Sequence, residues 1–201
     1  MKLELAGHLN KVRATVEDVE RIVDLYEYPD DSRTVLVRGL LATIDEHHRS
    51  VLLLIKRGAV GSAYALAGVI IRSTRYGLWI NACATSDEIL RTPQEHDTTL
   101  SISEMNKEIE VAYQGDPFFV ELRDRWAAKL YRYSSETFVR LGQFSIDPKS
   151  GLQHQDEELR DVLTIATLCI VLLASKFLAT QKHAVECKQV EAFAMAYAEK
   201  V

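Results

Sequence analysis

The chain has 201 residues, enough for one domain with a substantial hydrophobic core. Hydrophobic residues make up 47% of it and charged residues 26%, which is typical of a folded globular protein and excludes a disordered chain. The net charge of −5 argues against binding nucleic acid through a global positive field. The three cysteines, Cys83, Cys169 and Cys187, are far apart and form no CxxC pair, so they indicate reduced thiols in the cytoplasm.

The first half of the chain has the spacing of long helices. Apolar residues recur every three or four positions before Pro29, which predicts an amphipathic helix of about 25 residues. A second helix is expected over about 32–55, with Ser32 as its N-cap. A third is expected over about 59–84. It has no charge before Arg72 and is apolar on all sides, so we expect it to be the central helix of the fold.

Shorter helices are predicted in the middle of the chain. One starts at Ser86 and stops near Pro93. A fifth helix starts at Ser101, which forms a capping-box pattern with Glu104. A sixth covers about 118–141.

The last predicted helix, about 156–200, contains neither proline nor glycine. Unbroken, it would be roughly 65 Å long in a domain about 40 Å across, so it either breaks near 179–183 or projects. Its most apolar stretch, 162–175, is roughly 14 residues, shorter than the ~20 of a membrane span. We therefore expect a core helix, no membrane association, and an all-α, single-domain antiparallel bundle over 1–201.

The third predicted helix carries Arg72, Arg75 and Trp79 on one face. A guanidinium on an apolar helix needs a carboxylate, a carbonyl or a bound anion. Two interpretations remain open. One is a structural ion pair with Asp45 or Glu46, and the other is a phosphate or carboxylate pocket with Trp79 as a stacking wall. Both lead us to expect a largely buried, paired Arg72.

Candidate metal and cofactor residues are few. His47 and His48 point about 100° apart on a helix, so they cannot bind one metal together, and we expect interfacial histidines. His183 and Cys187 lie one turn apart, but no second pair of ligands is near them in sequence, so packing is favoured. The chain has no glycine-rich phosphate loop. We expect no metal and no cofactor.

The sixth predicted helix has a basic edge formed by Arg125, Lys129, Arg132 and Arg140. Such an edge can lie along a phosphate backbone. Glu121 stands four residues before Arg125, and Glu136 interrupts the edge, which is typical of a solvated face. RNA is therefore the disfavoured partner.

Two segments resemble uncharacterised all-helical bacterial families that are distantly related to the HEPN superfamily. They are IRSTRYGLWI at 71–80, continued by NACATSDEI at 81–89, and YRYSSE at 131–136 before the acidic start of the last helix. The resemblance covers roughly 34–178. It implies a helical domain of a kind that often dimerises and that includes toxin and defence ribonucleases.

The chain departs from these families at two points. Thr74 and Arg75 stand near the usual glutamate of the first segment, and residues 134–136 replace the expected histidine of the second. Active HEPN ribonucleases have an arginine followed four to six residues later by a histidine, which Arg91 and His96 match. The resemblance would make His96 the general acid/base and Arg91 the group that stabilises the scissile phosphate.

The leading hypothesis is a cytoplasmic homodimer that serves as a binding module or a degenerate ribonuclease linked to stress or phage defence. The dimer would form through the C-terminal helix. Two alternatives stay open: an active metal-independent ribonuclease that uses Arg91 and His96, and a helical scaffold without a small ligand.

We predict that the purified protein has no metal-independent ribonuclease activity dependent on Arg91 and His96. Pro93 lies between them and disfavours helical geometry, so nothing local holds both side chains on one face. Glu95 and Asp97 would also repel a phosphate backbone. RNA cleavage in EDTA that is lost in folded Arg91→Ala and His96→Ala variants would contradict this prediction.

Overall fold

The computed structural model describes residues 3–91, 101–124 and 156–198. Within these ranges the chain forms helices joined by turns and contains no strand, which confirms the all-α prediction. Residues 117–124 are also helical. The other helices are α1 (Leu3–Val23), α2 (Ser32–Lys56), α3 (Val60–Ala82), α4 (Ser86–Arg91), α5 (Ile102–Tyr113), α7 (Asp156–Thr180) and α8 (Ala184–Ala198).

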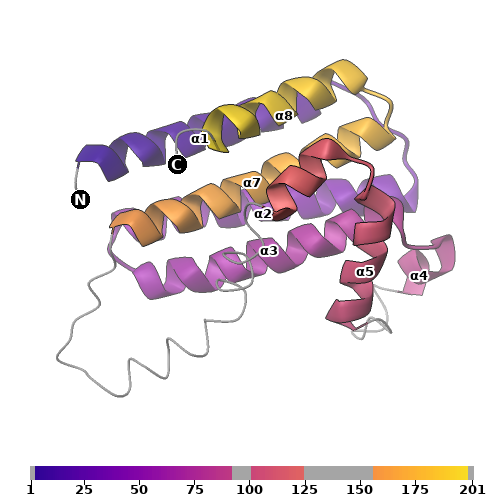
Figure 1. The fold of residues 1–201 in the computed structure, drawn as a ribbon, viewed down its shortest axis with the longest axis horizontal. Coiled ribbons are helices and arrows are strands. Elements are labelled where there is room, and N and C mark those ends of the chain that lie inside the picture. The colour runs from indigo at the N-terminus through magenta and orange to yellow at the C-terminus, as the bar shows by residue number, and fades with distance from the viewer. Residues whose placement is uncertain (1–2, 92–100, 125–155, 199–201) are drawn as a thin grey trace.

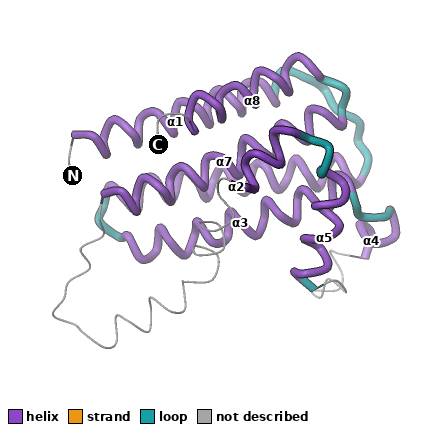
Figure 2. Tube along the Cα trace, in the orientation of Figure 1, coloured by secondary structure: helices purple, strands orange, loops and turns teal. Residues whose placement is uncertain are grey.

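The long helices form a bundle in which α7 lies between two layers (Figure 1). Helices α1 and α8 lie side by side on one side of α7, and α2 and α3 lie on the other. The helices joined by short connections, α1 to α2, α2 to α3 and α7 to α8, run in opposite directions, whereas α3 and α7 run the same way (Figure 2). Helix α5 crosses the others steeply at the end of the bundle where α4 also lies.

The most enclosed helix is α7, not α3 as predicted. From Leu159 to Leu178 nearly every residue of α7 is buried, whereas α3 reaches the surface at Arg72. A helix that is apolar all round needs neighbours on every side, and α1, α2, α3 and α8 provide them. Among the described residues α7 is also the one helix long and apolar enough to cross a membrane, and most of it is covered inside this fold.

The C-terminal segment breaks where its length requires. Helix α7 ends at Thr180, Lys182 adopts a left-handed backbone with φ of 65°, and α8 begins at Ala184. The His183 amide donates to the Leu178 carbonyl at 2.9 Å, which closes the turn. Of the two alternatives left open by the sequence, a break near 179–183 or a projecting end, the structure has the break, and α8 folds back on α7.

Two local features show how side chains set helix ends and helix spacing. The capping box of Ser101 and Glu104 is present, but the N-cap of α2 is Asp31, not Ser32, because the Asp31 carboxylate accepts from the Thr34 amide at 3.1 Å. A Cβ added at Gly77 of α3 would lie 2.7 Å from the Leu173 side chain of α7. Glycine thus permits the close approach of these two helices.

Candidate functional site

The face of α3 that carries Arg72, Arg75 and Trp79 differs from expectation. Arg72 is exposed and has no carboxylate partner among the described residues, so the prediction that it is largely buried is wrong. Burial lowers the pKa of half-buried Arg75. Trp79 is buried, and its Nε1 donates to Glu108 Oε2 of α5 at 2.6 Å. Its ring stacks on Tyr76 at a centroid distance of 5.9 Å. Trp79 therefore joins α3 to α5.

Several candidate residues lie outside the described residues. They are His96, Arg125, Lys129, Arg132 and Arg140. Arg91 closes α4, but the described part of the chain does not include its side chain. The predicted ribonuclease pair and the basic edge therefore remain predictions.

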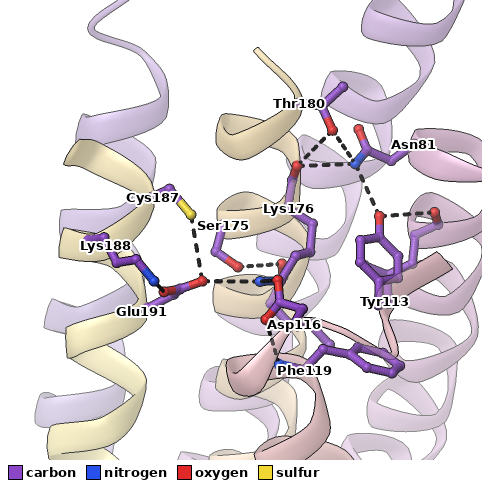
Figure 3. A network of polar contacts seen from close by, with 12 residues as sticks. Asn81, Tyr113, Asp116, Phe119, Ser175, Lys176, Thr180, Cys187, Lys188 and Glu191 are labelled. Atoms are coloured by element: carbon purple, nitrogen blue, oxygen red, sulfur yellow. Dashed lines mark hydrogen bonds and ion pairs between the residues drawn. The ribbon is translucent and has the colours of Figure 1, made fainter. Parts of the chain in front are cut away.

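A buried lysine lies at the junction of α7, α8 and the turn after α5 (Figure 3). Lys176 of α7 is 2% exposed, and its Nζ lies 2.5 Å from Asp116 Oδ2 and 3.0 Å from Glu191 Oε1. The ammonium also lies 5.1 Å from the centroid of the Phe118 ring. Glu191 accepts a second ion pair from exposed Lys188 at 3.0 Å.

The charges of this junction compensate one another. Burial by itself would raise the pKa of Asp116, but hydrogen bonds from Lys176 and from the Phe119 amide hold that pKa below its ordinary value. Two carboxylates face two ammonium groups, and every charge has a partner. The junction therefore acts as a clamp that fixes α8 and the start of residues 117–124 on α7.

Asn81 of α3 extends this polar junction. Its amide nitrogen shares its two protons among three acceptors, the Lys176 carbonyl at 3.1 Å, Thr180 Oγ1 at 2.9 Å and the Tyr113 hydroxyl at 3.2 Å. Burial raises the pKa of Tyr113 to about 12, so the phenol is neutral. These contacts tie the C-terminal turn of α7 to α3 and α5.

His183 and Cys187 do not converge on a metal-like arrangement. The His183 ring stacks on Tyr26 at 4.0 Å, and the Cys187 thiol donates to Glu191 Oε1 at 3.6 Å. No group of three or more His, Cys, Asp or Glu side chains in the described ranges is placed to hold a metal ion.

His48 is a buried histidine on α2 whose ring faces α7. It is 0% exposed, and its Nε2 lies 3.0 Å from the Thr167 hydroxyl. Burial lowers the pKa of His48 to about 4, so the ring is neutral at pH 7. Its Nδ1 is buried without a hydrogen-bond partner among the described residues.

Two neighbouring cavities form a groove between α1 and α2. The larger, of about 300 Å³, has Val19 of α1 and Leu41 of α2 among its walls and Ile170 of α7 at its base. The smaller, of about 170 Å³, is lined in part by His48. Both cavities are lined by Val16 and Asp45, so we treat them as one site and call it the α1–α2 groove.

Asp45 is the polar centre of the α1–α2 groove. Its Oδ2 pairs with Arg49 Nε at 2.9 Å, and Arg49 also reaches Glu20 of α1 at 2.7 Å. The other oxygen, Oδ1, is buried and has no hydrogen-bond partner in the described part of the chain. An apolar concave site with a few convergent polar groups is the usual form of a small-ligand site.

Sequence reasoning missed the clamp and the groove. The sequence does indicate that Lys176 is unusual, because it is a lone charge that interrupts a strongly apolar run. Asp45 and Arg49 are spaced for a helical ion pair, but that spacing is common on solvated surfaces. No local pattern indicated that Asp116 and Glu191 meet Lys176, or that Asp45 faces α1.

We predict that Lys176→Met lowers the free energy of unfolding by about 3 kcal/mol, because it leaves Asp116 and Glu191 without their shared cation. Lys188→Met, at a side chain that is 79% exposed, should change it by less than about 1 kcal/mol. Urea denaturation measures both. An equal effect of the two changes would contradict the clamp.

The clamp also predicts a pH dependence. A carboxyl with a lowered native pKa stabilises the fold above its unfolded pKa of about 4, and this contribution is lost as pH falls through the native value. Wild-type stability should therefore fall below about pH 4, and Lys176→Met should lose less over the same range.

No protein-family model, curated protein or solved structure matches this chain.

Proposed function

We propose that the protein is a HEPN-like helical binding module of the bacterial cytoplasm, and that the α1–α2 groove is its site for a small ligand. The resemblance of residues 71–89 and 131–136 supports the family, the homodimeric state and a link to stress or phage defence. The all-helical fold is compatible with that family. The groove supplies the binding site.

One observation carries the proposed binding role. Asp45 lines both cavities of the groove and keeps a buried oxygen without a donor among the described residues. A buried acceptor without a donor costs about 1–3 kcal/mol, which a suitable ligand would recover on binding. The apolar walls supply contact area for the rest of that ligand.

The chemistry of the described nucleophiles favours binding over catalysis. Burial raises the pKa of all three thiols, of Cys169 to about 12, so they are protonated at neutral pH. His48 is neutral and enclosed, so it is poorly placed for proton exchange with a substrate. The charges of the Lys176 clamp are already paired with one another.

We predict that Gly39→Trp closes the groove to ligands. Gly39 lines the larger cavity, and a Cβ added there meets no atom within 4 Å, so the indole can cover the opening without a clash at its base. Replacing a glycine in the middle of α2 by tryptophan, whose helix propensity lies between those of glycine and alanine, should also add up to about 0.5 kcal/mol of helix stability. Fluorine NMR of a set of cationic, neutral and anionic aromatic fragments measures binding.

Gly7→Trp is the matched control, because Gly7 is an exposed glycine of α1 that has equally open space and does not line the groove. Fragments should bind to wild type and Gly7→Trp and lose binding to Gly39→Trp. If no fragment binds wild type, or if Gly39→Trp binds fragments as wild type does, the groove is not the ligand site.

The homodimer is a separate part of the proposal. Helix α8 folds back, so the length of the C-terminal segment no longer argues for a projecting arm, but Val185 on its outer face is 75% exposed. We expect light scattering to give twice the chain mass of 22.7 kDa and Val185→Asp to weaken the dimer. A monomeric wild type would remove the dimer and leave the groove proposal standing.

A further inference from the structure

Two polar atoms of α2, from residues that line the α1–α2 groove, have no hydrogen-bond donor in the described part of the chain. Asp45 and His48 are three residues apart on α2, so they lie on the same face one turn apart. Asp45 Oδ1 and His48 Nδ1 are both buried, and neither has a hydrogen-bond partner in the described ranges. Buried polar atoms in proteins are nearly always hydrogen-bonded, so two such atoms on one wall call for a physical explanation.

Both atoms are acceptors. The Thr167 hydroxyl uses its single proton to donate to the Leu163 carbonyl at 2.8 Å. The contact of 3.0 Å between His48 Nε2 and that hydroxyl therefore places the imidazole proton on Nε2. Nδ1 of the neutral ring is then a bare lone pair, as is the free oxygen of Asp45. These two atoms can therefore accept hydrogen bonds but cannot donate them.

The charged side chains that line the larger cavity also favour a ligand that donates hydrogen bonds. Its lining contains three carboxylates, from Glu20, Asp24 and Asp45, and one guanidinium, from Arg38. The guanidinium of Arg38 lies 5.3 Å from the centroid of the Tyr28 ring, so it makes a cation–π contact there. Even when Arg49 is counted against its two partners, the carboxylates remain in excess. The larger cavity therefore favours a cation. The smaller cavity adds the pair of Arg13 and Glu17 and the cation Lys56, so the groove as a whole is charge-balanced and the site for a cation lies in its larger cavity.

We infer that the groove binds an organic cation, a ligand with a primary ammonium group on an apolar body of about one ring. This inference rests on the proposed function, because it names the ligand class of the same site. The ammonium group pairs with the carboxylate of Asp45, whose Oδ1 has no donor in the described ranges, and the apolar body packs against Val16, Val19 and Leu41. An ammonium supplies three donors and no acceptor, and one of these donors matches the oxygen of Asp45 that has no donor.

The inference is tested with three probes of one shape: benzylammonium, benzyl alcohol and benzoate. Protein-observed NMR titration gives the affinity of wild type for each. Benzylammonium should bind at least about tenfold more tightly than benzyl alcohol, since a charge-assisted hydrogen bond is roughly twice as strong as a neutral one. Benzoate should bind most weakly, because it adds a fourth carboxylate to the cavity.

Two variants that each remove one negative charge show whether the preference for benzylammonium depends on Asp45. Asp45→Asn keeps the side-chain shape and should reduce benzylammonium affinity to that of the alcohol. Asp18→Asn removes the same charge from an exposed residue of α1 outside the groove and should leave the preference unchanged. Asp24→Asn, at the edge of the cavity, should reduce the preference about two- to fivefold and provides a second variant if Asp45→Asn is unstable.

The outcomes separate the two proposals. One outcome is that aromatic fragments bind wild type and not Gly39→Trp while benzylammonium binds no more tightly than benzyl alcohol. In that case the cation inference is wrong and the groove remains the ligand site. Equal loss of preference in Asp18→Asn and Asp45→Asn would also overturn it, because the effect would then come from net charge alone. If neither the fragments nor the three probes bind, both proposals fall.

Discussion

The fold depends on the complete burial of α7. Its apolar side chains cover every face of the helix, and at about 25 cal/mol per Å² of buried apolar surface no arrangement that leaves one face in water competes. Four helices therefore pack around it. The glycine at 77 lets α3 approach closely, and the turn at 181–183 returns α8 along the opposite side. The hydrophobic core is continuous because α1, α2, α3 and α8 all pack on this one helix.

The lysine in this buried helix imposes a second constraint. A charge at Lys176 that is 2% exposed requires carboxylates at the same depth, and the chain provides one from the turn after α5 and one from α8. The packing of these two elements on α7 therefore also neutralises the buried charge of Lys176. The clamp sets how far α8 is rotated and shifted along α7, because only one register brings Glu191 to the ammonium.

The α1–α2 groove is a consequence of the same central helix. Helices α1 and α2 each pack on α7, and the space between them is lined by short valine and alanine side chains that do not fill it. Asp45 bridges this space through Arg49 to Glu20, so α1 and α2 are joined by an ion-pair chain at the rim of the groove. A site formed in this way has apolar walls, a polar centre and an opening at Gly39.

The sequence by itself determined the all-α class and the approximate positions of the described helices. Apolar periodicity, the capping box at Ser101 and the prolines act within a few residues, so these features could be predicted, although the N-cap of α2 is Asp31 and not Ser32. The length of the last segment left a break near 179–183 and a projecting end as alternatives. Depth could not be predicted. The same periodicity placed Arg72 in the core and α3 at the centre, because a local pattern does not say which of two apolar helices is surrounded.

Only the tertiary structure decided which polar groups meet. Lys176 and Asp116 are 60 residues apart, Arg49 and Glu20 are 29 apart, and both pairs depend on how helices are rotated and shifted against one another. Rotation and shift are set by the packing of all the side chains at once, with α7 as the common neighbour. The clamp and the groove therefore follow from the assembled core, and the residues that form them carry no local sequence pattern that distinguishes them from an ordinary helix surface.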